Sequence, residues 1–316
     1  MSEVKLAEEV QQQFIALKKE ISKVIIGQEE VVDTLLTAIF CKGHCLLVGV
    51  PGLAKTLLIQ TISNALDMDF NRIQFTPDLM PSDILGAETL DANRDFKFIQ
   101  GPIFSNIVLA DEINRTPPKT QSALLESMQE KSVTIAGKKY NLDEPFFVLA
   151  TQNPIEQEGT YPLPEAQLDR FMFMINLSYP SFQTEMEVVK RGKVDTASIQ
   201  KVITKEKLLQ YQSLITQVPV PDNVIEYAVK LVHKTRPQSE FAPEVTKEFL
   251  SWGAGPRASQ FLIAGAKCHA LLHGKFSPDI EDVKAIALPT LRHRIVRNFK
   301  AEAEGLSEAD IITKLL

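Results

Sequence analysis

Two short stretches of this chain carry the residue types best suited to phosphate chemistry. Residues 49–56 read Gly-Val-Pro-Gly-Leu-Ala-Lys-Thr, and residues 107–114 form an apolar run that closes on Asp111 and Glu112. A glycine-bearing loop that opens a helix attracts phosphate through its backbone N–H groups and through the helix N-terminus. Together the two stretches predict a site for a nucleotide and its magnesium ion.

Each polar side chain of these stretches has a predicted role. Lys55 can reach the β- and γ-phosphates, and the hydroxyl of Thr56 can ligate Mg²⁺. Asp111, at the carboxyl end of its strand, would hold the water shell of the same ion, which leaves Glu112 free to polarise an attacking water. We therefore expect ATP hydrolysis, with Glu112 as a catalytic residue and with Thr56 and Asp111 as metal ligands.

The order of the two stretches supports this interpretation more than either stretch does alone. The strict phosphate-loop pattern has glycine before the lysine, where this chain has Ala54. An Asp-Glu pair that closes an apolar run is also often a plain solvated strand end. Loop, helix, strand and carboxylates nevertheless follow in the required order, with roughly 50 residues between Lys55 and Asp111 for a further helix and strand.

Composition and length limit the class of protein. The 316 residues exceed the size at which one core keeps growing, so two domains are expected. The net charge of −6 argues against a nucleic-acid partner. The three cysteines, Cys41, Cys45 and Cys268, cannot all pair within the chain and indicate a reducing compartment. No signal sequence is apparent and no apolar run approaches the ~20 residues that span a bilayer, so we expect a cytoplasmic protein without membrane insertion.

Five short apolar runs alternate with helical stretches in the first half of the chain. The runs are Cys45–Val48, Arg72–Phe75, Ile107–Ala110, Phe146–Ala150 and Phe171–Leu177. Amphipathic spacing predicts helices over 4–22 and 28–41 before them, and further helices over 55–66 and 118–130 between them. Such alternation predicts an α/β fold with a parallel five-stranded sheet flanked by helices.

Two intervals do not fit this alternation. Residues 86–101 interrupt a helix that begins near Pro81 and contain a turn-like segment at 91–94. Residues 131–145 carry alternating β-branched residues around a glycine turn, which is typical of a hairpin. We expect both to project from the ligand edge of the sheet.

The segment Ser178-Tyr179-Pro180 marks the predicted domain boundary. Residues 1–179 would form the nucleotide-binding α/β domain and residues 180–316 a helical lid domain. Proline and glycine positions delimit the lid helices. The expected helices span about 183–193, 204–216, 222–235, 243–251, 257–273 and 278–287.

Two polar residues near strand ends are further candidates. Asn153 follows the fourth run and could orient the water or contact the γ-phosphate. Arg170 precedes the fifth run, and two interpretations stay open for it. It could stabilise charge on a phosphoryl group of another subunit, or it could form a salt bridge with Asp169 or Glu165.

The lid offers one further candidate and one weaker pattern. Arg257 lies in the first turn of a predicted helix, where the helix dipole disfavours a cation, so an outside anion is expected there. His269 and His273 stand four apart on one helix face, which is compatible with a metal. Without a glutamate or a third ligand in the pattern, a packed or solvated pair is favoured.

These residues together resemble the AAA+ ATPases, and specifically the MoxR branch, from Val24 to about Arg297. In that family the Ile-Gly-Gln segment borders the adenine, the loop at 49–56 is the phosphate loop, and Asp-Glu-Ile-Asn-Arg carries the Walker B carboxylates. Ala54 is then the family's own variant. The resemblance implies nucleotide binding by Ile26, Gly27, Gly49, Val50, Pro51, Gly52, Leu53, Ala54, Lys55, Thr56 and Leu57.

Three further stretches carry the resemblance into the rest of the site. Residues around Asn153 resemble sensor 1, those around Arg170 resemble the segment with the arginine finger, and Gly255-Pro-Arg257 resembles sensor 2. The family implication is that Asn153, Arg170 and Arg257 join Glu112 in catalysis. The intervals 86–101 and 131–145 resemble the helix 2 insert and the pre-sensor 1 hairpin.

The resemblance also implies how the protein works. It implies a homo-oligomeric ring, expected to be a hexamer, in which Arg170 faces the nucleotide of the next subunit. ATP and Mg²⁺ would drive chaperone-like remodelling, maturation or cofactor insertion of a client complex, beside a partner with a von Willebrand factor A domain. A DNA-associated motor and a non-hydrolysing ATP-dependent scaffold are the alternatives. The acidic balance counts against the motor, and Glu112, Asn153 and Arg170 count against the scaffold.

Overall fold

A five-stranded parallel sheet forms the centre of the N-terminal part of the protein. The computed structural model describes residues 3–90, 95–155, 159–192 and 198–316, so the turn expected at 91–94 lies outside the described residues. The strand order is β2-β5-β8-β1-β9. The strands are β1 (Cys45–Val48), β2 (Phe70–Gln74), β5 (Ile107–Asp111), β8 (Phe147–Gln152) and β9 (Phe173–Asn176). The expected α/β architecture is confirmed.

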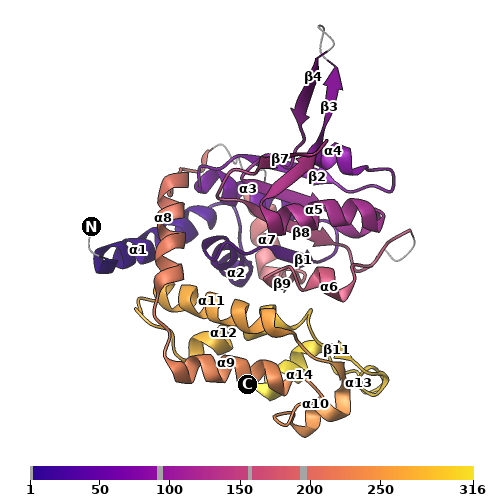
Figure 1. Cartoon of the computed structure of the whole chain (residues 1–316). Helices are drawn as coiled ribbons and strands as arrows, with labels where there is room; N and C mark the ends of the chain where they lie inside the picture. The colour runs from indigo at the N-terminus through magenta and orange to yellow at the C-terminus, as the bar shows by residue number, and fades with distance from the viewer. Residues whose placement is uncertain (1–2, 91–94, 156–158, 193–197) are drawn as a thin grey trace.

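Helices cover both faces of this sheet (Figure 1). They are α1 (Glu3–Ile21), α2 (Glu29–Phe40), α3 (Lys55–Ala65), α4 (Pro81–Leu85), the 3₁₀ turn η1 (Ile113–Arg115), α5 (Pro118–Glu130), α6 (Glu165–Leu168), α7 (Phe182–Arg191) and α8 (Lys205–Gln217). Because successive strand residues face opposite sides, Leu47 and Leu109 pack in the core that α1, α2 and α3 share. Leu46 and Val108 pack in a separate core with α4 and α5. The central strands are therefore apolar on both faces, as a parallel sheet requires.

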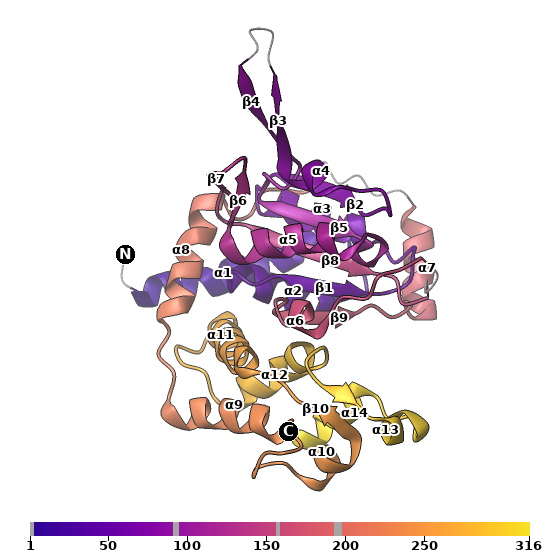
Figure 2. The same ribbon diagram turned by 45° about the vertical axis from the view of Figure 1, so that its right-hand side comes forward.

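Two hairpins leave the sheet domain at the predicted intervals. They are β3 (Gly86–Leu90) with β4 (Phe96–Gln100), and β6 (Ser132–Ile135) with β7 (Lys138–Asn141). The β3–β4 hairpin extends far beyond the body of the molecule (Figures 1 and 2). The rings of Phe98 and Tyr140 stack with centroids 4.2 Å apart, so the two hairpins touch each other.

The expectation that both hairpins leave the ligand edge is wrong for β6–β7. Glu144, just after β7, forms ion pairs with Lys131 at 2.8 Å and with Lys42 at 3.5 Å. Lys42 precedes β1, so this hairpin lies at the amino ends of the strands, opposite the phosphate loop. The reason is that α5 runs antiparallel to the sheet and returns the chain to that edge.

The lid is a helical layer below the sheet domain (Figure 2). Its elements are α9 (Asp222–Lys234), α10 (Glu244–Phe249), β10 (Leu250–Trp252), α11 (Pro256–Leu272), α12 (Ile280–Leu291), β11 (Val296–Arg297), α13 (Phe299–Ala303) and α14 (Glu308–Leu315). The β10–β11 pair, α13 and α14 were not anticipated from the sequence. In the part of the chain that the structure describes, no helix has the length and apolarity to cross a bilayer.

Helices α7 and α8 pack against the sheet domain, although they follow the boundary expected at residue 180. Arg191 of α7 donates to the carbonyl of Lys23 at 2.8 Å. Gln212 of α8 donates to the carbonyl of Ile39 at 2.7 Å. The division into 1–179 and 180–316 stays a prediction.

A buried arginine joins the lid to the sheet domain. Arg294, whose side chain is 2% exposed, donates from Nε to Asp169 Oδ1 at 2.8 Å. Its Nη2 donates to the carbonyls of Asp169 at 2.9 Å and Phe171 at 2.7 Å. Burial lowers the pKa of Arg294 to about 10, and the Asp169 carboxylate opposes that shift. The guanidinium therefore remains charged at neutral pH and holds the segment before β9.

We predict that Arg294→Met lowers the free energy of unfolding by about 3 kcal/mol, because breaking a buried ion pair leaves its partners unpaired. Urea unfolding followed by circular dichroism measures this. Lys300→Met is the matched control, since the Lys300–Glu248 pair is largely exposed and exposed pairs contribute about 0–1 kcal/mol. Equal losses in the two variants would contradict the assigned role of Arg294.

Candidate functional site

The loop at 49–56 connects β1 to α3 at the carboxyl edge of the sheet. Ala54 caps α3 in the left-handed conformation, with φ 56° and ψ 27°. An L-residue in this conformation costs roughly 1 kcal/mol, which explains why the strict pattern has glycine here. Lys55 and Thr56 follow in the first turn of α3, where the helix dipole and free N–H groups favour an anion.

The ammonium group of Lys55 lies among acceptors inside this loop. Its Nζ donates to the carbonyl of Gly49. Burial lowers the pKa of Lys55, while the negative charges of Asp111 and Glu112 oppose that shift. A partly desolvated cation beside two carboxylates is suited to receive a phosphate and its metal ion.

Asp111 ends β5 with both carboxylate oxygens engaged. Oδ1 accepts from the hydroxyl of Thr151 at 2.6 Å. Oδ2 accepts from Nε and Nη2 of Arg72 at 3.0 and 2.6 Å. Thr151 belongs to β8 and Arg72 to β2, so both neighbouring strands orient this carboxylate.

Glu112 shares Thr151 with Asp111 and has two side-chain partners of its own. Its backbone is left-handed at φ 58°, and its N–H donates to the Thr151 hydroxyl at 2.9 Å. Its Oε2 accepts from Nε2 of Gln74 at 2.8 Å and from Nη1 of Arg115 at 3.0 Å. Gln74 also accepts from Nη2 of Arg72 at 2.6 Å, so Glu112 and Asp111 belong to one hydrogen-bonded network that fixes both carboxylates.

Asn153 follows β8, which lies between β5 and β1 in the sheet. It is buried, and its Oδ1 accepts from the N–H of Ile155 at 3.2 Å. The N–H of Gly49 donates to the carbonyl of Gln152 at 3.1 Å, so the residue before Asn153 is bonded directly to the phosphate loop. The structure thus brings Asn153, the loop and the two carboxylates to one edge.

A cavity of about 660 Å³ opens beside the loop. It has the size of a small-molecule site. The predicted residues that line it are Ile26, Pro51, Gly52, Leu53, Ala54 and Leu57. Residues outside the predicted nucleotide-binding set also line it: Val24, Ile25, Gln28, Tyr179, Pro180, Thr184, Glu185, Val188, Val189, Arg191 and Gly192.

Helix α7 forms the wall of this cavity opposite the loop. A Cβ at Gly27, whose φ is +69°, would lie 2.4 Å from Cγ2 of Thr184. The glycine therefore serves both a left-handed backbone and a close approach to α7. The sequence signal for this wall was the pair of valines at 188 and 189 in the helix expected after the domain boundary. In the structure both side chains are exposed beside the cavity.

Arg170 and Arg257 lie at the other edge of the sheet. Both line a cavity of about 220 Å³ together with Gly43 and His44, which precede β1. Four strand residues at ~3.3 Å each separate that edge from the phosphate loop. The two arginines are therefore near each other but not near the loop of their own chain.

Within one chain, the contact found for Arg170 is with a backbone carbonyl and not with Asp169 or Glu165, the two carboxylates expected for a salt bridge. Nη1 of Arg170 donates to the carbonyl of Leu125 at 2.9 Å. Asp169 is bonded to Arg257 at 3.0 Å and to Arg294, so it is the anion that Arg257 meets inside the chain.

Comparison with known proteins agrees with this geometry. Residues 44–173 match the model of the ATPase family associated with various cellular activities (AAA), and residues 243–315 match an AAA lid domain. Chaperone MoxR1 of Mycobacterium tuberculosis is 42% identical over 298 residues, which cover 94% of this chain and 79% of that protein. The uncharacterised protein YeaC of Bacillus subtilis is 43% identical over 301 residues, covering 94% and 91%. A crystal structure of a candidate ATPase from Cytophaga hutchinsonii superposes with a TM-score of 0.91 at 43% identity, covering 98% and 95%.

We predict that Gly27→Ala weakens ATP binding about tenfold. The added Cβ would overpack the contact with Thr184 and displace α7 from the cavity, at a cost of roughly 1–3 kcal/mol. A loss of about 1.4 kcal/mol in binding free energy raises the dissociation constant tenfold. Titration of a fluorescent ATP analogue measures it, and a second change, Thr184→Ala, should restore most of the affinity.

Gly305→Ala is the matched control, because Gly305 has the same φ of +69° and no atom within 4 Å of the added Cβ. Its affinity for the analogue should equal that of the unaltered chain. If Thr184→Ala gave no recovery, the contact between α7 and Gly27 would not be the cause.

Proposed function

Because the chain belongs to the MoxR family of AAA+ ATPases, we propose that it binds ATP with Mg²⁺ at the 49–56 loop and hydrolyses it to remodel partner protein complexes. The observation that carries the proposal is the meeting of that loop, Asp111, Glu112 and Asn153 at one edge of the sheet beside a nucleotide-sized cavity. Family membership implies nucleotide binding in general, and the particular residue roles are our assignment.

The chain's own residues supply the binding site. The 660 Å³ cavity takes the nucleoside between Ile26, Leu53 and the wall formed by α7. Lys55 and the N–H groups at the start of α3 bind the phosphates. Thr56 and Asp111 hold Mg²⁺, which neutralises phosphate charge when it is bound. In the structure Oδ2 of Asp111 accepts from Arg72 at 2.6 Å, which orients the carboxylate that would hold the ion.

Glu112 is the proposed general base. Gln74 and Arg115 fix its Oε2, and the Thr151 hydroxyl fixes its backbone. It accepts a proton from the attacking water while Asn153 orients that water. The Asp111 carboxylate accepts from Arg72 and Thr151, and the Glu112 carboxylate accepts from Gln74 and Arg115, which favours separate roles in metal binding and proton transfer.

Arg170 and Arg257 act on the nucleotide of a neighbouring subunit. Their place at the amino edge of the sheet, away from their own loop, supports this assignment. An arginine supplied in trans stabilises charge on the transferred phosphoryl group and contributes ~10³–10⁵ in rate. The active unit is then a ring, expected to be a hexamer.

The ring would act in the cytoplasm as a chaperone-like machine. Chaperone MoxR1, 42% identical to this chain, supports the chaperone-like role. The expected clients are protein complexes that need maturation or cofactor insertion, with a von Willebrand factor A domain protein as partner. The two touching hairpins offer the ring an extended surface for such contacts.

We predict that Glu112→Gln keeps ATP binding within about twofold but lowers turnover by at least ~10², the scale of a lost general base. Single-turnover phosphate release and analogue titration separate the two effects. Glu126→Gln, at an exposed position of α5, serves as the control and should keep full turnover. If Glu112→Gln hydrolysed ATP at the unaltered rate, the base would be elsewhere.

We predict that mixtures of inactive variants reveal where each arginine acts. Arg170→Ala mixed with Glu112→Gln should regain part of the turnover, because some interfaces then combine an intact Glu112 with an intact Arg170. Arg257→Ala mixed with Glu112→Gln should recover for the same reason.

Arg170→Ala mixed with Arg257→Ala gives the discriminating result. If both arginines act in trans, every subunit lacks one of the two arginines that its neighbour's nucleotide needs, and the mixture stays inactive. Recovery here, with none for Arg257→Ala and Glu112→Gln, would place Arg257 at its own subunit's nucleotide. Turnover per subunit that did not rise with protein concentration, in a protein that stays monomeric, would exclude the trans arrangement for both.

A further inference from the structure

Two free cysteines meet where the sheet domain packs against the lid. Cys41 caps the carboxyl end of α2, and Cys268 lies near the end of α11. Sγ of Cys41 donates to the carbonyl oxygen of Ala264 at 3.3 Å. Ala264 stands four residues before Cys268, and residues four apart are neighbours on one helix face. The Cys41 thiol is therefore directed at the part of α11 that carries Cys268.

The two thiols also contact each other. Burial raises the pKa of the Cys268 thiol, and a hydrogen bond with Cys41 raises that pKa further. Burial likewise raises the pKa of Cys45, which interacts with Cys41 through charge and is hydrogen-bonded by the backbone of Phe173. Cys268, and not Cys45, is therefore the thiol partner of Cys41.

Cys41 is the cysteine that solvent reaches. Cys45 and Cys268 are 0% exposed. Cys41 is half-buried and lines a cavity of about 470 Å³, whose wall includes Ile215 of α8 and Val229 of α9. The thiolate is the reactive form of cysteine, and burial keeps Cys268 protonated. A reagent in solution therefore meets Cys41 first and reaches Cys268 only through Cys41.

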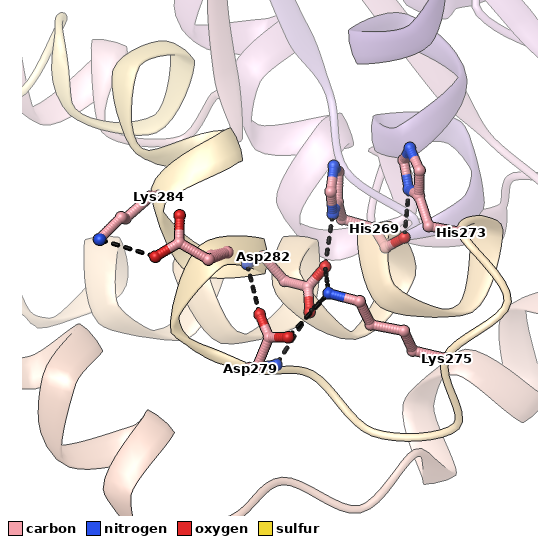
Figure 3. Close-up of polar contacts among 7 residues, drawn as sticks. His269, His273, Lys275, Asp279, Asp282 and Lys284 are labelled. Atoms are coloured by element: carbon pink, nitrogen blue, oxygen red, sulfur yellow. Dashed lines mark hydrogen bonds and ion pairs between the residues drawn. The ribbon is translucent and has the colours of Figure 1, made fainter.

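A bond between these two sulfurs would hold the lid as a layer. Helix α2 belongs to the core of the sheet domain, and α11 is a lid helix. The next residue after Cys268 is His269, whose Nδ1 lies 2.7 Å from Oδ1 of Asp282 in α12 (Figure 3). A crosslink at Cys268 would thus act on α11 and on the helix bonded to it.

We propose that Cys41 is a site of oxidation by low-molecular-weight disulfides, and that Cys268 converts the product into an intrachain Cys41–Cys268 disulfide. Disulfides of reducing compartments are usually transient and serve redox sensing. The bond would therefore fasten the lid to the sheet domain under oxidising conditions and open again on reduction.

Two thiol–disulfide exchanges form the bond. Cys41 loses its proton, and its thiolate attacks one sulfur of glutathione disulfide, which releases one glutathione and leaves a mixed disulfide on Cys41. Cys268 then loses its proton, and its sulfur attacks the Cys41 sulfur and releases the second glutathione. Each released glutathione thiolate takes up one proton. Two protein thiols are oxidised, and one glutathione disulfide is reduced to two thiols.

Incubation of the full chain in glutathione buffers, from fully reduced to fully oxidised, tests the proposal. The remaining thiols are alkylated in acid and counted, and unreduced digests are mapped by mass spectrometry. We expect the unaltered chain to lose two of its three thiols, to keep no bound glutathione, and to yield one peptide pair that links Cys41 to Cys268.

Single variants separate the two roles. Cys268→Ala should stop at the mixed disulfide, with one glutathione on Cys41. Cys41→Ala should keep both remaining thiols, because these are fully buried. Cys45→Ala is the matched control, since Cys45 is as buried as Cys268, and this variant should still form the Cys41–Cys268 bond.

Urea unfolding gives a readout of the fastening. The oxidised chain should unfold at higher urea than the reduced chain, because a crosslink that closes a long loop constrains the unfolded state most. Cys41→Ala should show no such difference between the two buffers. These measurements need no ATP, so their outcome is independent of the proposed ATPase function.

Retention of all three thiols at every glutathione ratio would overturn the proposal. A link from Cys41 to Cys45, or between two chains, would overturn the assignment of Cys268. An unchanged urea midpoint in the oxidised chain would contradict the fastening of the lid.

Discussion

The parallel direction of the five central strands is the constraint on which the rest of this structure depends. All carboxyl ends meet at one edge, so the loop after β1, the carboxylates after β5 and Asn153 after β8 become neighbours. Helix N-termini and strand ends at such an edge form a natural anion and ligand site. The same constraint sends Arg170, which precedes β9, to the opposite edge, and this position is why we propose that it acts on a neighbouring subunit.

Asp169 connects this sheet geometry to the lid. One carboxylate oxygen meets Arg257 from the start of α11, and the other meets the buried Arg294 after α12. The neighbour of Asp169 in the chain is Arg170, so one residue sets the relative positions of both proposed trans arginines.

Helix α11 carries opposite chemistries at its two ends. Arg257 stands at the amino end, where the helix dipole disfavours a cation and only an anion such as Asp169 compensates it. The stacked imidazoles of His269 and His273 stand at the carboxyl end, where the dipole favours a cation. The helix thus carries an anion-binding group in its first turn and basic nitrogens at its far end.

The sequence by itself determined the alternation of strands and helices in the sheet domain, the loop at 49–56 before a helix, the carboxylates at a strand end and both hairpins. These features depend on local periodicity and on turn residues, which are read within a few positions of one another. The resemblance to the MoxR family, stated from those motifs, is confirmed by the relatives. Tertiary structure alone decided that Thr184 covers Gly27, that Arg72 and Thr151 hold Asp111, and that β6–β7 lies at the amino edge. It also turned both Nε2 atoms of the histidine pair to one side. These contacts join residues far apart in the chain or depend on ring orientation, and packing of the whole fold sets them.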